Sequence, residues 1–351
     1  MDEFQIYREI HSQPETWKLI IKRFKEKEQS LREFLKDKDT FIFSGCGSGH
    51  NASVYSENIG DFFLKKACYA YQASEINFYA KEIYSKGNNK DTVTFLFSRS
   101  GNTTEVVGAL EKIKKDKLSS SFGITCYEDS LLYKSSDYSF SLADANEKAV
   151  TTTRSLTSMD LLSILVFNSL SADNNLTESI AKLPDFGEKV IKNFEELSKR
   201  IGETEKINKF FILSNKPNFG IARESKLKLL EMTLSWADCF NTLDFRHGPK
   251  AVVDENSLVV VFLSDNAFDY EFSIAKEMKD LGGNLLIFGD TVPKKFYSLT
   301  DNIVDLGENI SEWIRGILFL PVIQLLSYYK AIKKGLDPDN PKNLAYFVEI
   351  K

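Results

Sequence analysis

Short apolar runs alternate with segments of helical periodicity along most of this chain. A run such as Thr92–Phe97, which no charge interrupts, is typical of a strand buried on both faces of a parallel sheet. The segments between the runs repeat their apolar residues at helical spacing, which favours helices that cover such a sheet. The pattern therefore predicts an α/β protein. The strands expected in the first half are Thr40–Ser44, Ala67–Tyr71, Thr92–Phe97, Phe122–Cys126 and Tyr138–Leu142.

The second half of the chain repeats this pattern. Ser44 and Ser214 each end the first strand of their half, and Ser98 and Ser264 each end or follow a later strand, so the register between the halves is nearly kept. We therefore expect one domain design used twice. The strands and helices expected in the second half are Lys209–Ser214, Leu258–Leu263, Asn284–Phe288, Ile303–Leu306, Ile221–Ser235, Tyr270–Leu281 and Ser311–Lys334.

Two further helical stretches set the expected domain bounds. One runs from about Pro14 to Leu35, before the first strand, and the other from Asn174 to Arg200, between the two halves. The expected segments are an N-terminal helical segment at 1–36, a first domain at 37–173, a helical linker at 174–200, a second domain at 201–334 and a C-terminal tail at 335–351.

The turn after the expected strand Thr92–Phe97 has the composition of a phosphate site. Gly101 lets the backbone approach a ligand, and no carboxylate appears before Glu105. The helix that begins near Thr103 points its unpaired N–H groups at this turn, where anions bind. The same residues are also preferred helix caps, so the turn alone leaves both interpretations open. Its hydroxyl groups belong to Ser98, Ser100, Thr103 and Thr104.

Two other turns could complete a pocket. Gly45–Gly49 follows a strand and precedes a helix, at the edge where α/β sheets bind ligands. A dinucleotide site is improbable there, because Tyr69–Gln72 carries no acid to hold a ribose. The turn Val150–Ser155 precedes the expected helix Leu156–Leu170, and it could either close a polar wall or only cap that helix.

Candidate acid–base groups lie in the second half. Glu224, Lys228 and Glu231 share one helix face by their spacing, as a surface ion pair or as a partly buried proton-transfer base would. His247 lies in the loop Phe245–Lys250, and histidine both donates and accepts protons near neutral pH.

Composition excludes several other classes of protein. The formal net charge is −5 and the lysines are mixed with acids, so no basic stripe indicates a nucleic-acid partner. The four cysteines are far apart, which indicates neither a zinc site nor a disulfide framework. The apolar stretch Trp313–Tyr329 is interrupted by polar residues, and the N-terminus has no signal-type apolar core. We expect no membrane partner and a cytoplasmic location.

Three motifs together resemble the sugar isomerase (SIS) domain family, with two such domains in tandem. They are S-x-S-G-x-T at Ser98–Thr103, E-x(3)-K-x-x-E at Glu224–Glu231 and R-H-G-P-K at Arg246–Lys250. Within that family the chain is similar to the isomerase half of glucosamine-6-phosphate synthase, and to the group of amino-sugar-6-phosphate deaminases and tagatose-6-phosphate ketose/aldose isomerases. The resemblance implies two parallel sheets flanked by helices, each a flavodoxin-like three-layer sandwich.

The resemblance also implies roles for individual residues, without a metal or cofactor. Glu231 would move a proton between C1 and C2 of an open-chain sugar, while Lys228 and Glu224 orient it. His247 would assist ring opening from a neighbouring subunit, which implies a homodimer with shared active sites. The residues implied to hold the substrate are Ser98, Arg99, Ser100 and Thr103 at its phosphate, Ser48 and Gly49 on the opposite side, and Val150 and Thr152 along the sugar chain.

The chain departs from that family at its end. Members that make glucosamine 6-phosphate finish with L-A-K, whereas Leu344, Ala345 and Tyr346 stand here, so we expect Tyr346 over the pocket in place of the lysine. We also expect no glutaminase activity, since the sequence shows no glutaminase domain and no N-terminal nucleophilic cysteine. The predicted function is isomerisation of a hexose 6-phosphate, with deamination of an amino sugar 6-phosphate. The alternatives are a fructosamine-6-phosphate deglycase and a non-catalytic sugar-phosphate-binding regulator.

Overall fold

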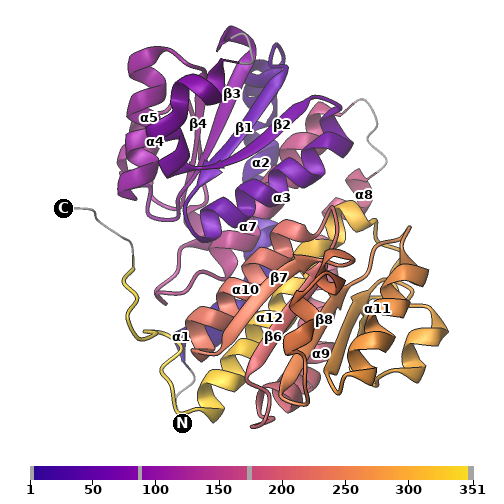
Figure 1. Ribbon diagram of the computed structural model, residues 1–351. Helices are drawn as coiled ribbons and strands as arrows, with labels where there is room; N and C mark the ends of the chain where they lie inside the picture. The colour runs from indigo at the N-terminus through magenta and orange to yellow at the C-terminus, as the bar shows by residue number, and fades with distance from the viewer. Residues whose placement is uncertain (1–3, 86–88, 172–175, 347–351) are drawn as a thin grey trace. The chain divides into compact units, whose positions relative to one another are not determined.

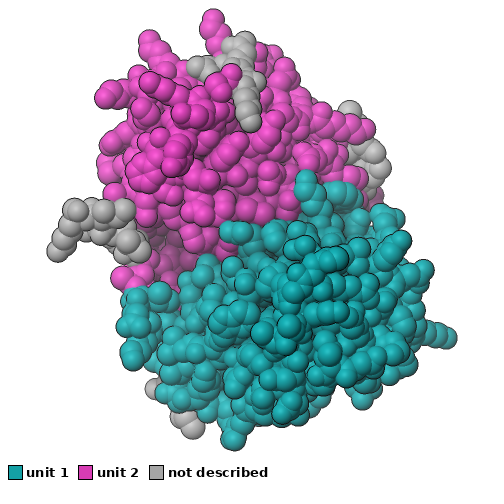
Figure 2. All heavy atoms as spheres, viewed as in Figure 1, with its two compact units in different colours: residues 1–11, 185–344 teal, residues 12–184, 345–351 magenta. Residues whose placement is uncertain are grey.

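The computed structural model describes residues 4–85, 89–171 and 176–346, and Figure 1 shows their helices and strands. They form two compact units, which Figure 2 colours separately. Unit 2 comprises residues 12–184 and 345–351, and unit 1 comprises residues 1–11 and 185–344. The first residues of the chain thus group with its second half, and the last residues with its first half.

The expected domain bounds did not include this exchange of ends, and they stay a prediction. The expected linker at 174–200 contains a short helix, α8 (Thr177–Ala181), and most of α9 (Leu183–Gly202). Parts of the expected segments, namely 1–3, 86–88, 172–175 and 347–351, lie outside the described residues.

Within its described residues, unit 2 is built on a five-stranded, all-parallel sheet in the order β2-β1-β3-β4-β5. Every strand expected in the first half is present, with ends shifted by one or two residues at most. The central strand β3 is buried along its whole length, as its unbroken apolar run predicts. The strands are β1 (Thr40–Gly45), β2 (Ala67–Gln72), β3 (Thr92–Phe97), β4 (Ser120–Thr125) and β5 (Tyr138–Ser141).

Helices cover both faces of this sheet (Figure 1). On one face, Ile42 and Leu96 of the strands pack with the apolar sides of α4 and α5. On the other face, the rings of Phe43 and Phe95 lie 5.6 and 6.4 Å from Phe167 of α7. Neighbouring strand residues therefore face opposite layers. The helices are α2 (Gln13–Leu35), α3 (Ser48–Leu64), α4 (Ala73–Tyr84), α5 (Thr104–Asp116), α6 (Leu131–Ser135) and α7 (Arg154–Leu170).

Unit 1 has a second five-stranded parallel sheet among its described residues, in the order β10-β9-β8-β6-β7. Both sheets thus have the same topology when each is numbered from its own first strand. On one face, α11 (Phe268–Asp280) packs through Ile274 and Met278. On the other, the ring of Phe319 of α12 (Glu312–Lys333) lies 5.2 Å from the ring of Phe262. The strands are β6 (Lys209–Ser214), β7 (Trp236–Asn241), β8 (Ser257–Phe262), β9 (Asn284–Gly289) and β10 (Ile303–Asp305).

The sequence pattern missed strand β7. It is an edge strand that pairs only with β6 in the described sheet, and Ala237 is its one buried residue. Trp236 at its start is 49% exposed. An edge strand does not need the unbroken apolar run that marks a strand buried on both faces, so the criterion that found the other strands could not find this one.

The remaining helices of unit 1 are α1 (Gln5–His11), α10 (Phe219–Thr233) and α12 (Glu312–Lys333). Both α1 and α10 pack against α12. In the part of the chain that is described, no helix has the length and apolar character needed to cross a lipid bilayer. The cytoplasmic location stays a prediction.

The strand order positions the candidate site. After β1 the chain crosses to β2 on one side, and after β3 it crosses to β4 on the other. The helices that follow these strands, α3 and α5, therefore begin at neighbouring strand ends. This reversal of direction is where open α/β sheets bind ligands.

Candidate functional site

The two turns at this reversal touch each other. A Cβ atom added to Gly49, in the first turn of α3, would lie 2.7 Å from the carbonyl oxygen of Phe97. The start of α3 therefore packs directly against the end of β3, and no larger residue than glycine fits between them. The turn at Gly45–Gly49 and the turn that begins at Ser98 form one continuous edge.

Three hydroxyl groups cluster on this edge. The Ser98 and Thr103 oxygens are 2.9 Å apart, and the Ser100 oxygen is 3.5 Å from each of them. Thr103 is the N-cap residue of α5, yet its side chain makes no capping hydrogen bond. The capping interpretation of this turn is therefore wrong for Thr103, and its hydroxyl belongs to the cluster. We call Ser98, Ser100 and Thr103 the hydroxyl cradle.

Gly101 is required by the shape of the cradle. Its φ angle is +65°, in the left-handed region that favours glycine. An added Cβ atom would lie 2.2 Å from the Ser130 hydroxyl oxygen and 2.7 Å from that of Thr125. The turn can keep this path only without a side chain at this position.

The third expected turn meets the first. Thr152 donates a hydrogen bond of 2.8 Å to the Ser48 hydroxyl. Ser48, which is expected opposite the other phosphate ligands, and Thr152, which is expected along the sugar chain, are therefore in contact. The neighbouring Cys46 is not a reactive thiol at neutral pH, because burial raises its pKa to about 12.

Glu147 is a buried carboxylate that the sequence analysis missed. It accepts hydrogen bonds from the backbone N–H groups of Thr153 and Arg154, at 2.6 and 2.7 Å, and from the Thr153 hydroxyl at 2.5 Å. The Ser155 hydroxyl donates to its other oxygen. Glu147 thus caps α7 from outside the helix. A cap that comes from a preceding loop has no fixed spacing, so no sequence signal marks it.

Arg99 is expected at the phosphate, and that role stays a prediction; in the structure its side chain contacts backbone carbonyls. The buried guanidinium donates to the carbonyl oxygens of Ala149 at 3.1 Å, Val150 at 2.9 Å and Tyr346 at 2.8 Å. It also stacks on the Tyr346 ring, 3.9 Å from the centroid. Val150 and Tyr346 are therefore brought together through Arg99.

Tyr346 is the last described residue, and its hydroxyl is fully engaged. It donates to the carbonyl oxygen of Glu147 at 2.7 Å and lies 3.1 Å from the Tyr127 hydroxyl. Burial raises the pKa of Tyr346, so its phenol stays protonated at neutral pH. The residue in the place of the family's lysine is thus an uncharged group beside the Val150 turn.

The acid–base candidates of unit 1 form a buried cluster on α10. The Lys228 ammonium lies 3.1 Å from Glu224 and 2.6 Å from Glu231. Lys228 and Glu224 are fully buried, so this is no surface ion pair. Burial alone would lower the pKa of Lys228, but the two carboxylates outweigh it and the pKa is raised. Lys228 therefore stays charged.

Glu231 is the accessible member of this cluster. Its side chain is 20% exposed, whereas Glu224 and Lys228 face only protein. A carboxylate that is oriented by a fixed ammonium and open on one side can accept a proton from a bound molecule. The motif left open whether these residues form a surface ion pair or a partly buried proton-transfer base. Their spacing alone could not show that Glu224 and Lys228 are buried.

His247 stands apart from this cluster. Its ring is exposed and makes no hydrogen bond or ion pair within the described parts of unit 1. The loop around it is held by Arg246 and Lys250, which both bond Glu277 of α11, at 2.8 and 2.5 Å. The structure thus fixes the loop and presents the histidine outward.

The corresponding turn of the second sheet already holds a carboxylate. Buried Glu271 of α11 accepts bonds from the Ser264 backbone N–H at 3.1 Å, the Ser264 hydroxyl at 2.7 Å and Asn215 at 3.3 Å. Burial raises its pKa to about 7. The sequence also places Asp265 and Asp269 near this turn. Asp265 pairs with Arg315 at 2.7 Å, and Asp269 is exposed beside Lys295, so the group inside the turn is Glu271.

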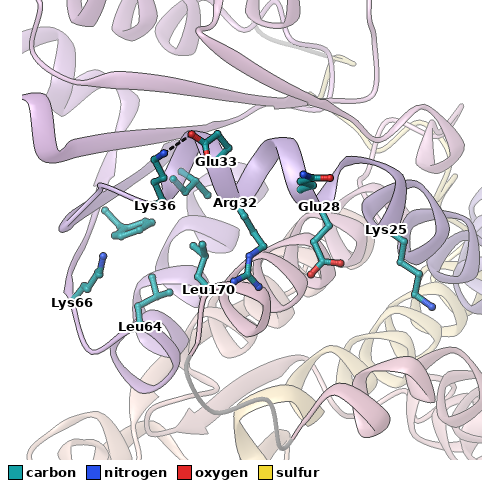
Figure 3. Close-up of a pocket in the computed structure, with 11 residues that line it drawn as sticks. Lys25, Glu28, Arg32, Glu33, Lys36, Leu64, Lys66 and Leu170 are labelled. Carbon is teal, nitrogen blue, oxygen red and sulfur yellow. Dashed lines mark hydrogen bonds and ion pairs between the residues drawn. The ribbon is translucent and has the colours of Figure 1, made fainter.

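One cavity of unit 2 lies apart from the expected site residues. It has a volume of about 620 Å³ and is shown in Figure 3. Its wall is formed by α2 side chains such as Arg32 and Lys36, together with Leu64, Lys66 and Leu170. One of its lining residues, Phe41, lies near the start of β1, whereas the cradle follows the end of β3. None of the expected site residues lines it.

Comparison with known proteins assigns the family. No protein-family model matches the chain. It is 30% identical, over 98% of its length, to the glutamine–fructose-6-phosphate aminotransferase (isomerizing) of Francisella tularensis. It matches the solved structure of glucosamine-6-phosphate deaminase from Thermotoga maritima with a TM-score of 0.80, at 28% identity, over 98% of this chain and 99% of that one. The chain belongs to the sugar isomerase (SIS) family.

The SIS fold extends to more distant structures. Tagatose-6-phosphate ketose/aldose isomerase from Escherichia coli matches with a TM-score of 0.86 at 21% identity, over 96% of this chain and 95% of that one. The chain spans 58 to 59% of the length of the first curated relatives it matches. The resemblance drawn from the three sequence motifs is confirmed.

Proposed function

We propose that this SIS protein isomerises a hexose 6-phosphate, and that it deaminates an amino sugar 6-phosphate to the ketose 6-phosphate. The observation that carries the proposal is the partly exposed Glu231 held 2.6 Å from buried Lys228. Its relatives include proteins named for isomerisation and for deamination of sugar phosphates. The strand order of both units supports a flavodoxin-like arrangement of each.

The hydroxyl cradle would anchor the phosphate. A dianion needs donors, and three hydroxyls lie together at the uncapped N-terminus of α5. Ser48 and Gly49 would line the opposite side at the start of α3, with Val150 and Thr152 along the sugar. Anchoring the distal phosphate uses binding energy far from the reacting carbons to position C1 and C2.

Glu231 would transfer the proton. It would take the proton from C2 of the open-chain amino aldehyde, giving an enol amine, and return a proton to C1 to leave a C2 imine. Water would then add to C2 and ammonia would leave, so one amino sugar phosphate and one water give one ketose phosphate and one ammonia. Lys228 would orient Glu231, and Glu224 would hold Lys228 in place.

His247 would open the sugar ring from a second subunit. Its outward position on a fixed loop suits a group that serves another chain, and this is why we propose a homodimer with shared active sites. Mixed dimers of His247→Ala and Glu231→Gln chains should regain turnover, because one of their two sites would keep both residues. Mixed dimers as inactive as the parents would rule out sharing.

A panel of substrates tests the activity itself. Glucosamine, galactosamine, fructose, tagatose and fructoselysine 6-phosphates should be assayed for ketose and for ammonia. We expect ketose and ammonia from an amino sugar 6-phosphate, loss of turnover in Glu231→Gln, and normal turnover in Glu111→Gln, an exposed glutamate of α5. Release of an amino acid instead of ammonia would indicate a deglycase. Binding without turnover, lost in Ser100→Ala and unchanged in Glu231→Gln, would indicate a regulator.

A further inference from the structure

The turn at residues 149–153 is held at both of its ends by buried charge. Glu147 fixes the far end, because its carboxylate accepts from the N–H and hydroxyl groups of Thr153 and from the N–H of Arg154. A carboxylate at the start of α7 is also favoured by the helix dipole. The turn that carries Val150 and Thr152 therefore ends on a rigid helix.

Arg99 fixes the near end. Its two terminal nitrogens donate to the carbonyl oxygens of Ala149 and Val150, and one lies 3.8 Å from the Glu147 carboxylate. Its own carbonyl oxygen accepts from the Cys126 N–H at 3.0 Å. The residue thus links the cradle turn to the 149–153 turn, with its main chain in one and its side chain on the other.

The same guanidinium also holds Tyr346. It donates to the Tyr346 carbonyl oxygen and stacks on the Tyr346 ring, whose hydroxyl reaches back to the Glu147 carbonyl. An arginine that serves as a phosphate ligand keeps its fork of N–H donors for the anion. The terminal nitrogens of Arg99 donate to three backbone carbonyl groups. The side chain therefore acts as a clamp, which holds backbone segments together.

We propose that Arg99 and Glu147 are positioning residues, which clamp the 149–153 turn and dock the C-terminal segment onto it through Tyr346. This deepens the proposed function, since it rests on that turn lining the sugar. Loss of the clamp would leave the phosphate anchor intact and would misplace the sugar chain. Tyr346, uncharged and stacked on Arg99, would form a wall of the substrate pocket where relatives that make an amino sugar carry a cation.

The test separates anchoring from positioning. Binding of inorganic phosphate would be measured by calorimetry, exchange of backbone amides in the 149–153 peptide by mass spectrometry, and turnover of a hexose 6-phosphate by ketose formation. The variants would be Arg99→Gln, Arg99→Lys, Tyr346→Ala and their double combinations, with Ser100→Ala as the anchoring variant. Arg23→Gln is a matched control, because its guanidinium bonds Asp144 in the same unit.

We expect Arg99→Gln to bind phosphate within about twofold of the wild type, while its 149–153 amides exchange faster. We also expect a fall in kcat of about ten- to a hundredfold with a smaller change in KM, as misplaced reacting carbons give. Adding Tyr346→Ala to Arg99→Gln should cost little more, because the two residues act as one unit. Arg99→Lys should recover part of the loss.

Two results would overturn the proposal. Phosphate binding weakened in Arg99→Gln as much as in Ser100→Ala would make Arg99 a phosphate ligand. Unchanged amide exchange in both Arg99→Gln and Tyr346→Ala would show that no clamp exists. Neither measurement depends on turnover. A wild type that is inactive on every sugar phosphate would rule out the proposed function, but phosphate binding and amide exchange would still test the clamp.

Discussion

At the scale of single residues, backbone geometry constrains the cradle as much as side-chain chemistry does. The cradle hydroxyls belong to Ser98, Ser100 and Thr103, and their oxygens lie 2.9 and 3.5 Å apart. These distances depend on a turn whose positive φ angle at position 101 requires glycine. The hydroxyls and the glycine could be predicted from the sequence, because both are local properties of one motif. The contact of Arg99 with Tyr346 could not, because it joins residues far apart in the chain.

Gly101→Ala should abolish phosphate binding. The new methyl group would meet the Ser130 hydroxyl at 2.2 Å, so the turn must move and the hydroxyls must separate. Gly335→Ala is a matched control: its φ angle is +69° and nothing lies within 4 Å of the added atom, so it should cost only about 1 to 2 kcal/mol of backbone strain. Calorimetry with inorganic phosphate would compare them, and equal phosphate affinity in both variants would contradict this account of the turn.

Lys228→Met should destabilise unit 1 and stop turnover. Removing the ammonium leaves Glu224 fully buried without its cation, which typically costs about 3 to 5 kcal/mol. Lys226→Met on the same helix removes a pair with Asp238 that is partly exposed, and should cost about 1 kcal/mol or less. Urea unfolding measures both. A Lys228→Met variant as stable as Lys226→Met would mean that the buried cluster carries no charge pair.

At the scale of elements, the hydrophobic pattern predicted most strands and helices because burial on both sides imposes an unbroken apolar run. The pattern missed β7, because a strand at the edge of a sheet need not be apolar throughout. It also missed the cap of α7, because Glu147 lies in the preceding loop. The two sheets also differ in a way that the repeated pattern hides. In the second sheet, the turn that corresponds to the hydroxyl cradle contains the carboxylate of Glu271, which accepts from Ser264.

Glu271→Gln should change how stability depends on pH. The pKa of Glu271 is raised from 4.5 to about 7, so the folded state holds its proton more tightly than the unfolded chain does. The free energy of unfolding should therefore fall as the pH rises from about 4.5 to about 7, by up to about 3 kcal/mol from this group.

Denaturant unfolding of wild type and Glu271→Gln at a series of pH values measures this contribution. The glutamine cannot ionise. The free energy of unfolding of the variant, relative to that of the wild type, should therefore rise as the pH increases across this range. Parallel pH profiles would show that Glu271 titrates normally in the folded protein.

At the scale of the whole molecule, the two halves expected from the repeat exist as compact units, but the chain ends are exchanged between them. The sequence could not show this, because α1 directly precedes α2 and nothing in its composition assigns it to unit 1. In the structure, Asp339 accepts from the first N–H groups of α1 at 2.8 and 2.7 Å, and Ile6 and Ile10 are fully buried.

Ile10→Ala should therefore loosen unit 1 and leave unit 2 unchanged. Deleting a buried isoleucine side chain costs about 2 to 5 kcal/mol, and α1 packs on α12. Hydrogen exchange should show faster amides in α12 and unaltered amides in β3. Leu19→Ala, at an exposed position of α2, should alter neither. Faster exchange in β3 than in α12 would mean that α1 stabilises the other unit.

We propose that the hydroxyl cradle binds the phosphate of a sugar phosphate and that Glu231 acts on its reacting carbons. A crystal structure with a hexose 6-phosphate bound tests it most directly. We expect phosphate oxygens about 2.7 to 3.0 Å from the Ser98, Ser100 and Thr103 hydroxyls, with the Glu231 carboxylate facing C1 and C2. A phosphate bound elsewhere, such as in the cavity of Figure 3, with Glu231 remote from the first two carbons, would contradict it.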